Sequence, residues 1–63
     1  MTVGKEIAKH RNKKGLTQRE LSESVGISRT YLADVEQDRY NPSLKVLARI
    51  AKELEMDINF ILK

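Results

Sequence analysis

The sequence predicts a compact all-α fold made of five short helices in one domain, residues 1–63. Apolar residues recur at intervals of three and four, which is the spacing of a helix face, and no stretch alternates as a strand does. Residues that favour helix starts precede these apolar runs. The chain has 63 residues, which suffice for a single domain but bury only a small core.

The first two helices are expected over residues 2–14 and 17–25. Gly15 ends the first helix, since glycine readily leaves the helical conformation. The second opens with Thr17 and Glu20 in the T-x-x-E spacing of a capping box, in which each side chain bonds the other residue's backbone N–H. The inner-face residues at i and i+4 are Val3, Ile7, Leu21 and Val25.

Three further helices are expected over residues 28–37, 43–54 and 58–62. Each follows a residue whose side-chain oxygen can accept a free backbone N–H; these N-cap candidates are Ser28, Ser43 and Asp57. The fourth helix has the clearest period, formed by Leu44, Leu47, Ile50, Ala51 and Leu54. Residues 38–42 are expected to form a loop, and Pro42 disfavours the helical conformation at Asn41.

Positive charge is concentrated near the N-terminus. The chain carries a net charge of +3. Residues 1–14 hold five basic side chains and one acidic one, whereas the middle of the chain is balanced and the end is slightly acidic. This distribution favours a polyanionic partner such as nucleic acid, although an ordinary solvated helix surface would have the same composition.

The composition argues against several classes of protein. There is no cysteine, which excludes disulfides and thiolate metal sites and is consistent with a cytoplasmic location. No apolar run has membrane-spanning length, and the N-terminus lacks the apolar core of a signal peptide. A single histidine without a clustered partner predicts neither a catalyst nor a metal ligand, and no glycine-rich phosphate loop is present. We therefore expect no enzyme activity, no cofactor and no metal.

The most informative segment is residues 17–37, where two predicted helices are joined by the short turn Val25-Gly26-Ile27-Ser28. A turn of this length, with a glycine free to adopt positive φ, makes the two helices cross steeply. The second helix of such a pair projects from the body, where the major groove of DNA, about 12 Å wide, can admit it.

The predicted third helix has one apolar side and one polar side when it is wound at about 100° per residue. The inner side carries Ser28, Leu32, Val35 and Glu36, and the outer side carries Thr30, Ala33, Asp34 and Gln37. Arg29 and Tyr31 lie at the two edges. Arginine, threonine and aspartate can all read base edges, but the same residues also suit a solvated helix face.

The region from Gly4 through Leu62 resembles the Cro/CI-type, or XRE, helix-turn-helix family, and in particular its small phage and bacterial repressors. The residues that carry the resemblance are Gly15-Leu16-Thr17-Gln18, Leu21, Val25-Gly26-Ile27-Ser28, Tyr31-Leu32, Glu36, Asn41-Pro42-Ser43, Leu47, Ile50-Ala51 and Leu54. No single match is specific, but all of them occur in register. The resemblance implies a lambda-repressor-like fold, binding to double-stranded DNA, and repression of transcription.

The resemblance also implies roles for individual residues. The base-contacting residues would be Ser28, Arg29, Thr30 and Asp34. The phosphate-contacting residues would be Gln18, Tyr31, Arg39, Tyr40, Asn41, Ser43 and Lys45, with core packing as the alternative for Tyr31. The free N–H groups and helix dipole at Gln18 favour an anion there. Arg11 and Glu36 are expected to form a structural ion pair, because an unpaired carboxylate on the inner side of the third helix would be costly.

Two kinds of partner are expected besides DNA. Residues 57–62 are more apolar than one-sided packing requires, so Ile61 and Leu62 are candidates for a homodimer interface, unless a short chain simply ends on its core. The rival function is a protein-interaction module, such as an antitoxin or a regulator that acts through a protein partner or antirepressor. The sequence leaves open whether a further domain follows residue 63.

Overall fold

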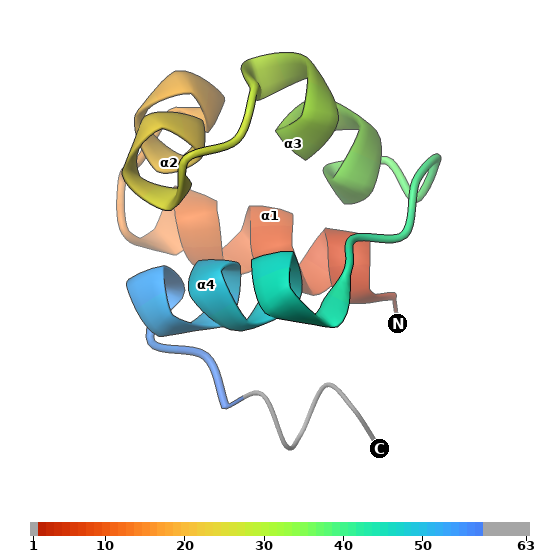
Figure 1. Cartoon of the computed structure of the whole chain (residues 1–63). Coiled ribbons are helices and arrows are strands. Elements are labelled where there is room, and N and C mark those ends of the chain that lie inside the picture. Colours follow the sequence, from red (N-terminus) through yellow and green to blue (C-terminus); the bar gives the residue numbers. More distant parts are fainter. Residues whose placement is uncertain (1, 58–63) are drawn as a thin grey trace.

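The structure is a computed structural model, and it describes residues 2–57 (Figure 1). Within this range the chain folds into four helices and no strand: α1 (Val3–Lys13), α2 (Gln18–Val25), α3 (Arg29–Glu36) and α4 (Leu44–Leu54). The all-α prediction is therefore confirmed, but four helices are observed rather than the five predicted. The expected fifth helix, residues 58–62, lies outside the described residues.

Each helix begins with a side-chain oxygen that accepts the backbone N–H three residues later. The predicted capping box is present in full: the Glu20 N–H donates to Thr17 Oγ1 at 3.0 Å, and the Thr17 N–H donates to Glu20 Oε1 at 2.9 Å. The bond from the Thr17 backbone lowers the pKa of Glu20 below its usual value of 4.5. The complete set of N-caps is Thr2, Thr17, Ser28 and Ser43. These local signals explain why the helix starts were predictable.

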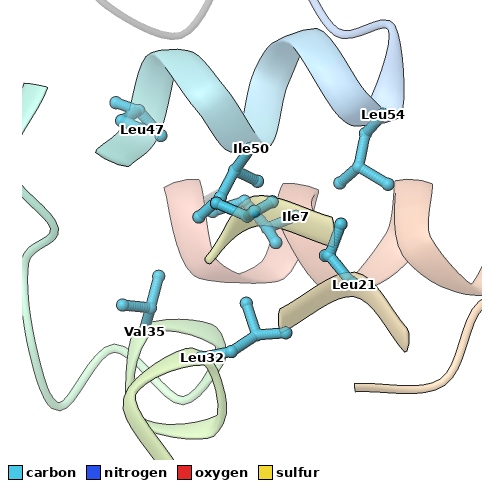
Figure 2. Close-up of a cluster of buried hydrophobic side chains, with 8 residues drawn as sticks. Ile7, Leu21, Leu32, Val35, Leu47, Ile50 and Leu54 are labelled. Carbon is cyan, nitrogen blue, oxygen red and sulfur yellow. The ribbon is translucent and has the colours of Figure 1, made fainter. Parts of the chain in front are cut away.

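The core is formed by apolar side chains from all four helices, which meet in the middle of the molecule (Figure 2). Ile7, Leu21, Leu32 and Ile50, one from each helix, are fully buried. Burying one such side chain contributes roughly 1.5–3 kcal/mol. Leu32 and Val35 are the only apolar residues of α3 with less than a tenth of their surface exposed. Apart from the buried Glu36, the rest of α3 is therefore wholly or partly open to solvent or to a ligand.

The N-terminal end of α1 packs directly on the backbone at the C-terminal end of α3. A Cβ atom at Gly4 would lie 2.8 Å from the Glu36 carbonyl oxygen and closer still to that of Val35, so no larger residue fits without a shift. The Thr2 hydroxyl donates to Asp38 Oδ2 at 2.8 Å across the same contact. This contact fixes the end of α3 against α1.

The turn between α2 and α3 has the geometry that the sequence predicts. Gly26 ends α2 with φ of 85°, a left-handed conformation that glycine adopts without strain. Ser28 then caps α3. The described residues 2–57 contain no helix that is both long enough and apolar enough to span a lipid bilayer.

Candidate nucleic-acid interface

The outer face of α3 presents two free polar side chains. Arg29 and Thr30, in the first turn, are exposed, and neither side chain has a hydrogen bond or ion pair with any residue in the range 2–57. Asp34 lies one turn further along and is half-buried, with its Oδ1 4.0 Å from Nη1 of Arg39. At that distance the pair is a weak surface contact, and both groups remain able to bind a ligand.

The two predicted serine contacts already have structural roles. Ser28 Oγ accepts the Tyr31 N–H at 3.0 Å, and Ser43 Oγ accepts the Val46 N–H at 3.2 Å. A hydroxyl that accepts in a cap still has its own proton to donate. Both serines can therefore donate to a phosphate or a base without leaving the helix start, but a substitution would also remove a cap.

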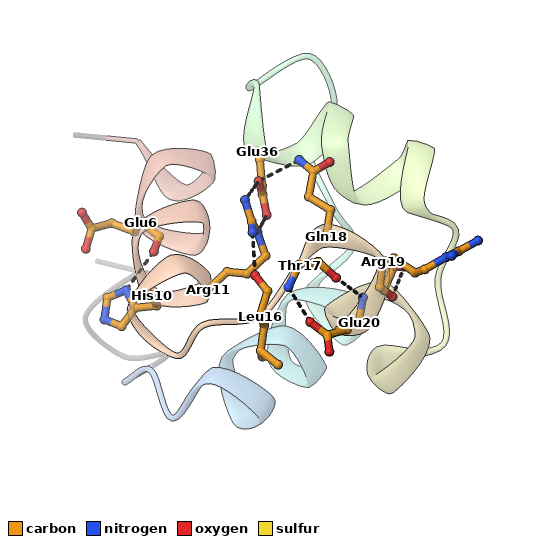
Figure 3. Close-up of polar contacts among 10 residues, drawn as sticks. Glu6, His10, Arg11, Leu16, Thr17, Gln18, Arg19, Glu20 and Glu36 are labelled. Carbon is orange, nitrogen blue, oxygen red and sulfur yellow. Dashed lines mark hydrogen bonds and ion pairs between the residues drawn. The ribbon is translucent and has the colours of Figure 1, made fainter.

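A polar network joins α1, α2 and α3 behind the exposed face (Figure 3). The ion pair expected between Arg11 and Glu36 is present, with Arg11 Nε 2.8 Å from Glu36 Oε2 and Arg11 Nη2 3.2 Å from Oε1. Arg11 Nη1 also donates to the Leu16 carbonyl oxygen at 2.7 Å. Both charged side chains are largely buried, so the network satisfies groups that would otherwise be costly to bury.

Gln18 belongs to this network, which the sequence did not indicate. Its Nε2 donates to Glu36 Oε1 at 3.0 Å. The amide is thus held in one orientation at the first position of α2, where backbone N–H groups have no partner within the helix. Gln18 was predicted as a phosphate contact, and the structure adds that its side chain is fixed by the residue that anchors the end of α3.

The loop between α3 and α4 lies beside α3 through an aromatic contact. The rings of Tyr31 and Tyr40 are 5.1 Å apart between centroids and inclined at 67°, an edge-to-face arrangement. Tyr31 is half-buried against the core, so core packing, the alternative for this residue, accounts for part of its surface. Tyr40 is 55% exposed.

The exposed residues that follow on this loop and on the first turn of α4 include Asn41 and Lys45. The predicted contact residues thus lie on α3, on the loop that follows it, and at the starts of α2 and α4. Neither the Tyr31–Tyr40 pair nor the Gln18–Glu36 bond was predicted. Ile61 and Leu62, the predicted dimer residues, lie outside the described residues.

Several known proteins that are similar to this chain are named as repressors or transcriptional regulators. The family model described as Helix-turn-helix matches residues 7–61. An immunity repressor protein of Bacillus phage phi105 is 48% identical over 61 residues, which cover 97% of this chain and 42% of that protein. The crystal structure of SinR, a master regulator for biofilm formation, in complex with DNA matches with a TM-score of 0.88 and 28% identity, over 98% of this chain and all of that one.

A second solved structure, the complex of the SinR and SinI proteins, matches with a TM-score of 0.89 and 28% identity, over 98% of this chain and 61% of the matched one. This chain spans less than half the length of the phage immunity repressor.

The fold and the exposed α3 face define a helix-turn-helix module. The chain belongs to the helix-turn-helix family, in its XRE-type branch of transcriptional regulators, which confirms the resemblance drawn from the sequence. That family is one of regulators rather than enzymes.

Proposed function

We propose that this chain binds double-stranded DNA in a sequence-specific manner and represses transcription by occupying an operator. The observation that carries the proposal is the free outer face of α3, where Arg29 and Thr30 are exposed on a helix whose other side is buried through Leu32, Val35 and Glu36. Membership of a family that includes a phage immunity repressor, and the match to a regulator solved on DNA, support it.

The proposed contacts divide by chemistry. Arg29, Thr30 and Asp34, with the Ser28 hydroxyl, would contact base edges in the major groove, where arginine pairs bidentately with guanine. Phosphate contacts would come from Gln18, Tyr31, Arg39, Tyr40, Asn41, Ser43 and Lys45, and these would set affinity and register. The helix α3 would thus enter the major groove, while Gln18 at the start of α2 and the loop after α3 hold the DNA backbone.

We further propose that two copies bind together. Two-fold related copies would place their third helices in successive major grooves, with half-site centres roughly 34 Å apart. Ile61 and Leu62 remain the sequence-based candidates for this contact. A regulator of this kind acts on DNA in the cytoplasm, which is the compartment we propose.

The protein-interaction alternative is not favoured as the main activity, because the family and its solved members are DNA-binding regulators. The SinR–SinI complex contains a similar regulator with a second protein. We extend that observation to this chain only as far as a protein partner that modulates DNA binding.

The proposal is tested by selecting bound duplexes from a random DNA pool with the full chain. We expect enrichment of a near-palindromic sequence whose half-sites are about 10 base pairs apart, and affinity that falls steeply with salt. Enrichment of a single half-site would contradict the proposal that two copies bind together, but it would still support sequence-specific DNA binding. No enrichment at any salt concentration would overturn the proposed function.

Arg29→Ala tests the base-reading role directly. We expect a loss of about 1–3 kcal/mol in binding and relaxed preference at one position of the selected site, measured by titrating all four base pairs at each position. Lys9→Ala, which removes an exposed charge from α1, is the matched control and should leave the preference unchanged. If the variant instead bound all sequences with equally reduced affinity, Arg29 would contact a phosphate rather than a base.

A further inference from the structure

A groove lies between the C-terminal end of α2 and the outer face of α4. It has a volume of about 420 Å³ and is lined by Ser24, Val25, Arg49, Lys52 and Glu53. The two helices pack against each other through their buried faces, so the groove runs along the edge of that contact. Val25 is 6% exposed and contributes a small apolar surface to the groove.

The charged side chains of this groove have no partners of their own. Within residues 2–57, Arg49, Lys52 and Glu53 form no ion pair and no side-chain hydrogen bond, although all three are exposed. Other exposed charges, such as Arg29, are likewise unpaired within these residues, whereas Lys14 and Glu55 form a surface ion pair at 3.2 Å. Two cations and one carboxylate are therefore free around a single hollow.

The groove is separate from the proposed DNA contacts. Ser24 and Val25 end α2, whereas Gln18 begins it. On α4, Lys52 follows Lys45 by seven residues, which is roughly 10 Å along the helix axis. In Figure 1 the C-terminal half of α4 lies at the end of the molecule away from the loop between α3 and α4. A ligand in the groove would leave Arg29 and Thr30 uncovered.

The mixture of charges distinguishes a peptide from a nucleic acid. Lys45, Arg49 and Lys52 share one side of α4, so the stripe that they form is also compatible with a DNA backbone. However, Glu53 lines the same groove, and its carboxylate can only accept hydrogen bonds, so the sugar-phosphate backbone of DNA, which has no donor, would leave it without a partner. A peptide presents both carboxylates for the two cations and backbone N–H groups for Glu53 and the Ser24 hydroxyl.

We infer that this groove binds an acidic peptide segment of a partner protein. A carboxylate of the segment would pair with Arg49 and Lys52, a neighbouring small apolar side chain would cover Val25, and Glu53 would accept a backbone N–H. Because the groove and the α3 face do not overlap, the segment and DNA can be bound at the same time; only this second statement rests on the proposed function.

The test is a selection of displayed random peptides on the full 63-residue chain without DNA. We expect enrichment of peptides with clustered aspartate or glutamate, and amide chemical-shift changes centred on Ser24, Val25 and Glu53 when a selected peptide is added. Arg49→Gln/Lys52→Gln should weaken that peptide about tenfold or more. The matched control Lys9→Gln/Lys13→Gln, with the same charge change on α1, should not.

A second variant tests the groove itself. Ser24→Glu places a carboxylate beside the two cations and should block the selected peptide, while circular dichroism shows an intact fold. Failure to enrich any acidic peptide, or equal binding to all variants, would overturn the inference. If Arg49→Gln/Lys52→Gln instead lowers DNA affinity and its salt slope with no peptide selected, the groove belongs to the DNA interface. Peptide affinity unchanged by an operator duplex supports simultaneous binding.

Discussion

Among residues 2–57, two that are not glycine adopt a backbone conformation that glycine usually provides. Asp38 after α3 has φ of 61°, and Glu55 after α4 has φ of 58°. Left-handed φ costs most L-residues roughly 1–2 kcal/mol, and aspartate less because its short side chain bonds locally. The Asp38 carboxylate also accepts a hydrogen bond from the Thr2 hydroxyl, and this bond helps to offset the backbone strain. Glu55 has only an exposed pair with Lys14 to offset its strain.

Glu55→Gly is therefore expected to stabilise the domain. Glycine removes the strain at φ of 58°, and the lost surface ion pair contributes little. We expect a gain of about 1 kcal/mol in the free energy of unfolding, measured by urea denaturation. Glu53→Gly, within the helix, should lower stability instead. A loss on Glu55→Gly would show that the Lys14–Glu55 pair outweighs the backbone strain.

The capping box of α2 predicts a pH dependence. The pKa of Glu20 is lowered by the hydrogen bond from the Thr17 backbone, so its carboxylate is favoured in the folded state. Its contribution is complete above the unfolded pKa, near 4.5, and is lost as pH falls through the lower folded pKa. Glu20→Gln should thus be less stable than the parent at neutral pH, with the difference shrinking in acid. Thermal melting across pH measures it; a constant difference would contradict it.

At the scale of elements, α3 is held by more than its apolar side. Leu32 and Val35 anchor one face, the Arg11–Glu36–Gln18 network anchors the end, and Gly4 lets the backbone of α1 approach that end more closely than a residue with a side chain would. A helix of eight residues has little intrinsic stability, so these contacts determine where its outer face points. The geometry for DNA binding therefore depends in part on residues that would not touch DNA, such as Leu32, Arg11 and Glu36.

Glu36→Gln tests this anchoring. The change keeps the shape but leaves Arg11 buried without its ionic partner, so we expect a loss of about 3 kcal/mol in the free energy of unfolding. Glu23→Gln, on the exposed side of α2, should change stability little. Arg11→Leu/Glu36→Leu should recover much of the loss, because well-packed apolar residues can replace a buried pair. If Glu36→Gln alone left the free energy of unfolding unchanged, the Arg11–Glu36 pair would contribute no more than a surface ion pair does.

At the scale of the whole molecule, the predictable features are the local ones. Hydroxyl caps at Thr17, Ser28 and Ser43 act over three residues, so sequence spacing alone revealed the helix starts. Apolar period similarly identified the inner faces. The Arg11–Glu36 pair was expected because a buried charge needs a partner and the family resemblance named one.

The features that were missed depend on contacts between distant parts of the chain. Gln18 reaches Glu36 across 18 positions, and Gly4 is constrained by backbone beyond residue 34. The groove at Arg49 and Lys52 requires α2 and α4 to be placed together first. Neither the spacing of apolar residues nor a helix cap predicts contacts between residues that are far apart in the sequence. The residue roles at the DNA face remain predictions that the selection experiments address.

The aromatic pair beside α3 gives the molecule an optical reporter. The chain has two tyrosines and no tryptophan, and both tyrosines belong to the Tyr31–Tyr40 contact. All tyrosine emission therefore originates at the proposed DNA face. We expect an operator duplex to change this emission without any added label, and Tyr40→Leu to leave a single emitter whose response isolates α3. Unchanged emission at saturating DNA would mean that the duplex docks elsewhere.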